Sequence, residues 1–371
     1  MKDIKRRGFL KKGSLAVLAG GAGIIGACSD KEKLESVQVN FNKSYKWKMV
    51  TTWPPNFPVL GEGCKLAAKW IEVMSGGRME VEVYGGGELI PSLEVFDAVS
   101  SGAVEMGSSS GYYWAGKIPA AQFFSSVPFG MNAQQMNAWV INAGGNKLWN
   151  EIYEPFNLLA LPGGNTGVQA GGWFNRQINT MEDLKGLKMR IPGLGAKVLK
   201  KAGGTPMLVA GGELFTNLER GVIDATEWIS PYHDYKMGFY KVAKYYYYPG
   251  WHEPGTILEM IFNKDKFQNL PVDLQEIIKT ATYRLNQWML TEFEAKNSLY
   301  LSKLVDEEKV DIRRFPDEVM GHLKDLSKEV IQELIDTDPQ SKKVFEHFNS
   351  FRQKMVPWSN MSEKVYHEVF N

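Results

Sequence analysis

The sequence predicts an α/β protein of two lobes, in which each lobe is a mostly parallel sheet flanked by helices. Segments in which apolar residues recur every second position alternate with segments of helical spacing, and this order occurs twice along the chain. A third observation is that residues 272–309 form a 38-residue stretch without glycine or proline. This stretch predicts a helix too long for one small lobe, so we expect it to cross both lobes. A helical C-terminus follows.

The first lobe is expected to span residues 44–165, in the order strand, helix, strand, helix, strand. This order is typical of a parallel sheet with covering helices. The predicted elements are strands over 45–51, 78–84 and 103–108 and helices over 59–74 and 93–100.

The second lobe is expected to span residues 166–250, and a further strand over 158–161 precedes it. The predicted elements are strands over 166–173, 187–191, 205–209 and 223–228, a helical turn over 180–184, and helices over 196–202 and 212–220. The four tyrosines 245–248 cannot all share one face of a regular element, so we interpret them as core and lobe-interface packing.

Two segments remain after the second lobe. Residues 251–310 are expected to hold a crossover segment and the long helix between the lobes. Residues 311–371 predict two or three amphipathic helices, broken near Pro316, Pro339 and Pro357.

The first 27 residues read as an export signal and are excluded from the fold. KRRGFLK at 5–11 resembles a twin-arginine signal, and the uncharged run that follows has 15 residues, too few for a bilayer-spanning helix of about 20. The residues before Cys28 resemble a lipoprotein cleavage box, so Cys28 is either lipidated or the signal is simply cleaved. Residues 28–43 are polar and predict a tether. We therefore expect a periplasmic or other extracytoplasmic protein.

Composition and motifs exclude several classes of function. Residues 1–27 carry a net charge of +5, which leaves −4 for the rest of the chain, and a mildly acidic body is unsuited to nucleic acid. The GAGIIG run at 21–26 matches a dinucleotide-binding fingerprint only in letters, because it lies in the signal core and has no acidic residue at the required distance. There is no nucleophile elbow or phosphate loop, and the five histidines form no recognisable metal-ligand pattern.

The stretch GLKMRIPG at 186–193 predicts a strand that ends in an arginine. Leu187, Met189 and Ile191 alternate on one face, and Lys188 and Arg190 share the other. One interpretation is a solvated sheet edge. The alternative places Arg190 at the carboxyl end of a strand, where open α/β sheets bind their ligands.

Other polar side chains occupy comparable positions. Gln169 lies in an otherwise apolar or glycine-rich strand, Glu227 and Trp228 end the strand IDATEW, and Glu253 follows an aromatic run. Each has a purely structural alternative, such as a satisfied core amide for Gln169 or a turn carboxylate for Glu253. Together they predict polar groups that converge at the boundary between two lobes.

Two stretches resemble the extracytoplasmic solute-binding proteins of tripartite ATP-independent periplasmic (TRAP) transporters. They are INTMEDL (178–184) followed by GLKMRIPG, and GGELFTNLERGVIDATEWISP (211–231). The resemblance runs from about Lys46 to the C-terminus and implies the two-lobe periplasmic solute-binding fold. In that family a DLKGLKxR strand carries the arginine that pairs with a substrate carboxylate, which is Arg190 here. TEW followed by WHEPG (251–255) is similar to the branch that binds 2-oxo or 2-hydroxy acids with a metal cation.

The resemblance implies a specific site. Its substrate-binding positions are Arg190, Gln169, Trp228, Tyr113 and Tyr112, and its metal positions are Glu227, Glu253, Gln169 and Trp228. Arginine grips a carboxylate through two parallel hydrogen bonds, and the glutamates and the Gln169 amide offer hard oxygen ligands to a cation. Without a metal, one arginine, two glutamates and a monocarboxylate sum to −2. Ca²⁺ neutralises this charge better, whereas Na⁺ is what several relatives use, and both remain open; no organic cofactor is implied.

The leading hypothesis is therefore a receptor that closes on a pyruvate-like or lactate-like monocarboxylate and delivers it to TRAP membrane subunits, without being an enzyme. An exported enzyme acting on a small organic acid is the first alternative, because the twin-arginine route carries folded, often cofactor-loaded proteins. A lipoprotein scaffold without a small-molecule site is the second. The C-terminal segment swaps between subunits in the relevant branch, so monomer and homodimer both remain open, and membrane contact is expected only through a lipid anchor.

Overall fold

The structure is a computed structural model that describes residues 39–370. The expected signal, residues 1–27, and Cys28 lie outside the described residues, as does most of the expected tether. Among the described residues, no helix has both the length and the apolar composition needed to cross a bilayer.

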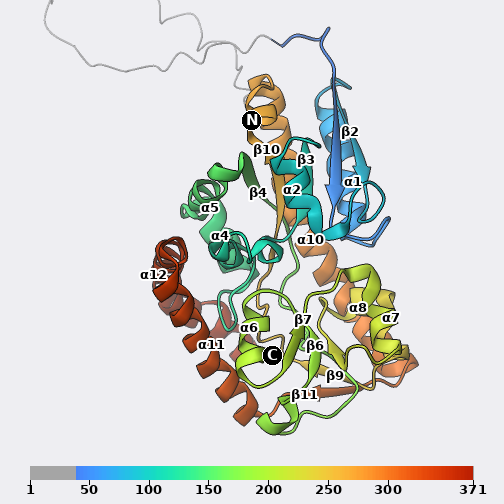
Figure 1. Cartoon of the computed structure of the whole chain (residues 1–371), viewed down its shortest axis with the longest axis vertical. Helices are drawn as coiled ribbons and strands as arrows, with labels where there is room; N and C mark the ends of the chain where they lie inside the picture. The colour runs from blue at the N-terminus through green and yellow to red at the C-terminus, as the bar shows by residue number, and fades with distance from the viewer. Residues whose placement is uncertain (1–38, 371) are drawn as a thin grey trace, which may run out of the picture. The chain divides into compact units, whose positions relative to one another are not determined.

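The first sheet and its helices form what we call lobe I (Figure 1). Its strands are β1 (Tyr45–Thr51), β2 (Met79–Tyr84), β3 (Met106–Ser109), β4 (Leu158–Asn165) and β10 (Ile257–Asn263), in the order β2-β1-β3-β10-β4. β1 is parallel to β2 and β3, whereas β10 is antiparallel to β3 and β4, so the sheet is mixed. Its helices are α1 (Leu60–Met74), α2 (Val95–Ser100), α3 (Gln122–Ser125), α4 (Ala133–Asn142), α5 (Gly145–Tyr153) and α9 (Lys264–Gln268).

Strand β10 returns the chain to lobe I long after the other strands of that sheet. Residues 257–263 form a strand between β3 and β4 that was not among the predicted elements. All seven residues are buried, including Glu259. A strand covered on both faces shows no alternation of apolar and polar residues, which explains why period 2 did not reveal it.

The second sheet and its helices form lobe II. Its strands are β5 (Gly172–Phe174), β6 (Lys188–Arg190), β7 (Thr205–Met207), β8 (Ala225–Thr226), β9 (Tyr245–Tyr248) and β11 (Asp311–Arg314), in the order β11-β9-β5-β8-β6-β7. β6 is parallel to β7 and β8, and β5 is antiparallel to β8 and β9, so this sheet is also mixed. Its helices are α6 (Gly193–Lys201), α7 (Leu214–Glu219) and α8 (Pro231–Met237).

Two predicted strands of lobe II are much shorter than expected. Residues 166–171 lie before β5 and are not a strand, and β8 stops at Thr226. Gln169 therefore lies in a loop, and Glu227 and Trp228 begin the segment after β8. These irregular stretches free the three side chains from the sheet and let them meet near the strand ends.

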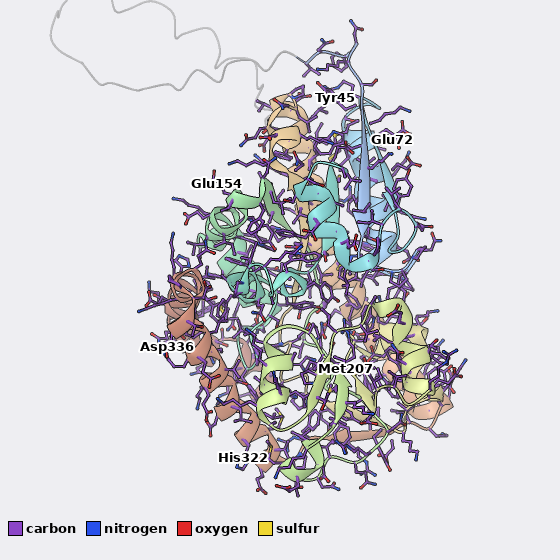
Figure 2. All side chains as sticks on the ribbon, in the orientation of Figure 1. Tyr45, Glu72, Glu154, Met207, His322 and Asp336 are labelled. Carbon is purple, nitrogen blue, oxygen red and sulfur yellow. The ribbon has the colours of Figure 1, made fainter. Side chains whose placement is uncertain are left out.

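The long helix is α10 (Val272–Ser302), and it packs against α1 and β4 of lobe I and against α8 of lobe II. The predicted helix across both lobes is thus confirmed, and it ends in one π-helical turn, Lys303–Glu307. Figure 2 shows side chains over both lobes, with Tyr45 at the start of β1 and Met207 at the end of β7.

The C-terminal helices are α11 (Asp317–Thr337), α12 (Pro339–Met361) and α13 (Glu363–Phe370). α12 packs against α3, α4 and α5 of lobe I (Figure 1). The predicted break near Pro357 is wrong, because Pro357 lies inside α12 and the helix ends four residues later. Proline removes one backbone hydrogen bond and favours a kink, but it does not oblige a helix to end there.

Candidate functional site

Arg190 is the last residue of β6 and its side chain is only 1% exposed. Lys188, two residues earlier, is exposed. The interpretation of Arg190 as part of a solvated sheet edge is therefore wrong, and its expected place at the carboxyl end of a strand is confirmed. Its Nε donates to the carbonyl oxygen of Val209 at 3.3 Å, which fixes the orientation of the guanidinium plane.

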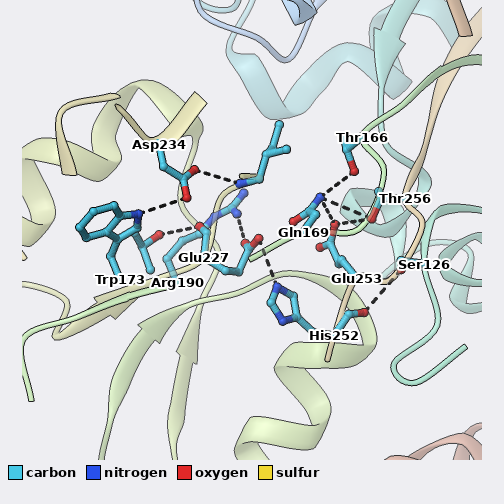
Figure 3. Close-up of polar contacts among 12 residues, drawn as sticks. Ser126, Thr166, Gln169, Trp173, Arg190, Glu227, Asp234, His252, Glu253 and Thr256 are labelled. Atoms are coloured by element: carbon cyan, nitrogen blue, oxygen red, sulfur yellow. Dashed lines mark hydrogen bonds and ion pairs between the residues drawn. The ribbon is translucent and has the colours of Figure 1, made fainter. Parts of the chain in front are cut away.

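The guanidinium of Arg190 forms an ion pair with the carboxylate of Glu227, and both side chains are 1% exposed (Figure 3). The two residues are also joined through the backbone, since the Glu227 N–H donates to the Arg190 carbonyl oxygen at 3.2 Å. Burial opposes the positive charge, but the Glu227 carboxylate and the Tyr113 and Tyr112 hydroxyls together outweigh it and raise the pKa of Arg190. The arginine is therefore charged and held in place by the strand-end glutamate.

Gln169 and Glu253 form a second buried group of polar atoms. The Gln169 amide nitrogen donates to Glu253 Oε2 at 2.7 Å and to Thr166 Oγ1 at 3.1 Å, and the Thr256 hydroxyl donates to Glu253 Oε2 at 2.6 Å. The other amide atom, Gln169 Oε1, is buried and has no hydrogen-bond partner among residues 39–370. A buried acceptor without a donor is costly, and its presence points to a group that it would coordinate.

Glu227, His252 and Glu253 bring their ligand atoms within 4.8 Å of one another, and all three residues are buried. Burial and then the nearby charge of Glu227 raise the pKa of Glu253 to about 8. Two carboxylates and a free amide oxygen suit a hard cation, which would relieve the repulsion between the glutamates. The residues present therefore fit the cation that the sequence analysis predicts.

Sequence reasoning missed His252. Its Nε2 lies 3.6 Å from Glu227 Oε2, and neither ring nitrogen has a hydrogen-bond partner among the described residues. The histidine is adjacent to Glu253 in the sequence but far from Glu227, so no ligand spacing revealed the cluster. Its position within WHEPG was the one available signal.

Tyr112 and Tyr113 reach the site from lobe I, on a 3₁₀ turn, Gly111–Trp114, that follows β3. Arg190 donates to the Tyr113 hydroxyl at 3.1 Å, and the two tyrosine rings pack edge to face. Tyr112 packs against Gly193 at the start of α6, where φ is +61° and a Cβ would lie 3.0 Å from the tyrosine Cβ. Only glycine suits this position, where lobe I approaches the end of β6.

Trp228 lies beside the arginine, with its ring 5.3 Å from the Arg190 guanidinium. Its side chain is 5% exposed. Gly211 packs on the indole so closely that a Cβ there would lie 2.5 Å from the ring. The structure thus brings all seven residues of the predicted site together at the ends of β6 and β8: Tyr112, Tyr113, Gln169, Arg190, Glu227, Trp228 and Glu253.

Beneath the tyrosine-bearing turn lies Glu259 of β10, which is fully buried. It accepts hydrogen bonds from the Trp114 indole and, at 2.7 Å, from the Tyr153 hydroxyl. Burial raises the pKa of Glu259 from an ordinary 4.5 to about 7. In the folded protein this carboxyl therefore holds a proton at pH values where the unfolded chain has released it.

We expect Glu259 to make the protein less stable as pH rises from about 4.5 to 7. In that window the folded state binds more protons than the unfolded state, so the free energy of unfolding falls with pH. Glu259→Gln should remove this contribution, so its stability relative to wild type should grow by an amount on the order of 1–3 kcal/mol across the window. Urea denaturation at several pH values measures the difference. A stability difference between wild type and Glu259→Gln that does not change with pH would contradict the raised pKa of Glu259. Burial also raises the pKa values of Glu253 and Asp234, but both residues are present in both proteins, so their contributions cancel in the difference.

Residues 49–338 match the DctP family, described as bacterial extracellular solute-binding protein, family 7. The chain is 39% identical over 363 residues, 98% of each protein, to a monocarboxylate 2-oxoacid-binding periplasmic protein of Nostoc sp. (strain PCC 7120).

Three solved structures have the same fold, each with a TM-score of 0.86. A TRAP periplasmic solute-binding protein from Pseudoalteromonas atlantica T6c, with bound sodium and pyruvate, is 41% identical, and the match covers 89% of this chain and 100% of that one. One from Colwellia psychrerythraea, with bound calcium and pyruvate, is also 41% identical, with 88% and 100% covered. A TRAP transporter solute-binding protein from Bordetella bronchiseptica RB50, a mixed-occupancy dimer with copurified calcium and picolinate, is 35% identical, with 88% and 97% covered. The chain therefore belongs to the DctP family of bacterial extracellular solute-binding proteins, the solute receptors of TRAP transporters.

Proposed function

We propose that this receptor binds a small 2-oxo or 2-hydroxy monocarboxylate together with a bridging cation and delivers it to TRAP membrane subunits. One observation carries the proposal. Arg190, Glu227, Glu253 and the Gln169 side-chain oxygen, which has no hydrogen-bond partner among the described residues, are all buried and lie close together. An anion and a cation bound side by side satisfy all four groups. Two relatives carry pyruvate, a 2-oxo monocarboxylate, with sodium or calcium, and a third carries calcium and picolinate, a monocarboxylate with a ring nitrogen next to the carboxylate-bearing carbon.

In the proposed complex the Arg190 fork holds the ligand carboxylate, and Tyr112, Tyr113 and Trp228 lie around it. Glu227, Glu253, Gln169 Oε1 and the Trp228 carbonyl oxygen would hold the cation, either Na⁺ or Ca²⁺. When bound, the cation supplies positive charge that offsets the two glutamates beside the anion.

Ligand retention would follow from closure of the two lobes. Arg190 belongs to lobe II and Tyr113 to lobe I, yet their side chains are joined by a hydrogen bond. A ligand in contact with both residues interacts fully only with the closed arrangement, and this differential affinity shifts the protein toward closure. We infer a binding role without catalysis; turnover of 2-oxo acids by the purified protein would favour the alternative of an exported enzyme.

We also propose an extracytoplasmic location and a homodimer formed through α12 and α13. Large apolar side chains are exposed on these helices: Val356, Trp358, Met361, Val365 and Val369. Burying such a surface against a second copy is favourable, and the Bordetella bronchiseptica relative is a dimer. Light scattering gives the oligomeric state, and the mass of the exported protein distinguishes a lipidated Cys28 from a simply cleaved chain.

The direct test of the proposed function is native mass spectrometry of the protein purified from the periplasm of the bacterium that produces it, with metal analysis of the same sample. We expect one monocarboxylate and one Na⁺ or Ca²⁺ per chain. Recovery of a sugar, an amine or a nucleotide, or a chain that binds no 2-oxo acid in solution, would contradict the proposal.

Ligand charge gives a further prediction: pyruvate and lactate should bind far better than succinate, malate or glucose. A dicarboxylate brings a second charge, and burying it without a partner is expensive. Two lysines that could supply a second positive charge have other contacts, Lys117 with Asp97 and Lys236 over the Tyr300 ring. Glucose would leave Arg190 without an anion. A competition series followed by tryptophan fluorescence measures the order, and succinate displacing pyruvate would show that a second basic group reaches the site.

A further inference from the structure

His233 of α8 contacts both lobes, outside the group of residues assigned to the ligand. It is fully buried, and the Trp228 indole N–H donates to its Nδ1 at 3.3 Å. Its Nε2 lies 2.7 Å from the carbonyl oxygen of Pro58, in the loop between β1 and α1 of lobe I. Because Nδ1 accepts a hydrogen bond, the proton of the neutral ring is on Nε2, which therefore donates to Pro58.

Aromatic packing holds the imidazole in this orientation. Phe57 of the same lobe I loop and Phe293 of α10 each pack edge-on against the His233 ring, with centroids 4.7 Å away. Phe57 also packs edge-on against Trp228, at 5.9 Å. The ring is thus enclosed by lobe I and by the helix that crosses both lobes.

The indole of Trp228 connects this cluster to the site. The six-membered ring of the indole packs against Gly211, a position where no side chain fits. The indole also lies 5.3 Å from the Arg190 guanidinium. Loss of the hydrogen bond to His233 would leave the indole N–H buried without a partner, which favours a shift of the ring. Any such shift changes the surface against which Arg190 rests.

We infer that His233 is a positioning residue that holds Trp228 beside Arg190 and bonds lobe II to lobe I, and thereby slows ligand release. The inference rests on the proposed function, because it takes Arg190 and Trp228 as ligand contacts. The His233 imidazole would then couple Trp228, on the ligand-binding side of lobe II, to the lobe I loop that contains Pro58, through one hydrogen bond to each. That loop is not part of the predicted site.

The test compares His233→Phe, which keeps the aromatic packing but loses both hydrogen bonds, with His233→Gln, whose amide can donate to Pro58. The probes are pyruvate with NaCl or CaCl₂, followed by stopped-flow tryptophan fluorescence and calorimetry. We expect His233→Phe to bind about 10- to 100-fold more weakly, mainly through faster dissociation, and His233→Gln to recover most of the affinity. If His233→Phe does not fold, His233→Asn, whose shorter amide reaches Trp228 but not Pro58, tests the bond between the lobes.

The chain offers a matched control in His347 of α12, whose Nδ1 accepts from the Trp139 indole at 3.0 Å. His347→Phe removes the same kind of bond away from the site and should leave binding unchanged. Equal pyruvate affinity and dissociation rate in wild type and in folded His233→Phe would overturn the inference, as would equal losses in His347→Phe.

Failure of the proposed function is distinguishable, because it appears as absence of pyruvate binding by the wild type. In that event spin labels at the exposed positions Lys69 of lobe I and Lys200 of lobe II report on the bond between the lobes without a ligand. The inference expects a broader distance distribution in His233→Phe than in wild type and His347→Phe, and an identical distribution would overturn it.

Discussion

Replacement of Arg190 with alanine is expected to weaken pyruvate binding by about 2–5 kcal/mol, or roughly 30- to 4,000-fold in affinity. The guanidinium is buried and is positioned by Val209, Glu227 and Tyr113, so no water can replace its paired hydrogen bonds to a carboxylate at low cost. Arg190→Lys should lose most of this affinity as well, because an ammonium cannot form the planar fork. Isothermal calorimetry measures both variants.

The controls separate loss of binding from loss of fold. Arg190→Ala leaves the buried Glu227 charge unpaired, which by itself costs about 3–5 kcal/mol of stability. The double variant Arg190→Ala/Glu227→Gln removes that charge, and its thermal unfolding shows whether the fold survives. Lys188→Ala alters an exposed residue of the same strand and should bind normally. Undiminished pyruvate binding by Arg190→Ala would remove the arginine from the site.

Removal of the cation is expected to have the second large effect. Chelation followed by dialysis into sodium-free buffer should lower pyruvate affinity, and addition of Ca²⁺ or Na⁺ should restore it. Without the cation, the ligand carboxylate faces Glu227 and Glu253, and burial, followed by the nearby Glu227 charge, already raises the pKa of Glu253. Glu227→Gln and Glu253→Gln should each weaken cation-dependent binding at least about tenfold, since even outer-shell changes cost this much at metal sites.

Glu219, exposed at the end of α7, provides the matched control for these two substitutions. Glu219→Gln removes the same charge from the same lobe and should leave the cation dependence as it is in wild type. A pyruvate isotherm that is indifferent to every cation tested would instead assign Glu227 and Glu253 to a structural role, with Glu227 serving only as the partner of Arg190.

Local sequence patterns were sufficient for the class of fold and for most elements of both lobes. The alternation in MEVEVY gave β2, and the absence of glycine and proline gave α10. The same patterns placed Arg190 at a strand end and selected polar residues that converge near it. Gln169, expected within a strand, lies instead in the loop before β5. Such patterns are readable because period and breakers act over a few residues, where the backbone geometry is the same in any protein.

The contacts between distant segments were decided by the tertiary structure alone. β10 carried no alternation because both of its faces are covered, and His252 joins Glu227 only because the chain crosses back between the lobes. The bond from His233 to Pro58 spans 175 positions. The sequence by itself therefore determined which side chains have the chemistry to bind an anion and a cation. Which of them meet, and which carboxylate the arginine pairs with, depends on how two sheets pack around one shared helix, because burial and proximity are properties of the folded chain and not of any local segment.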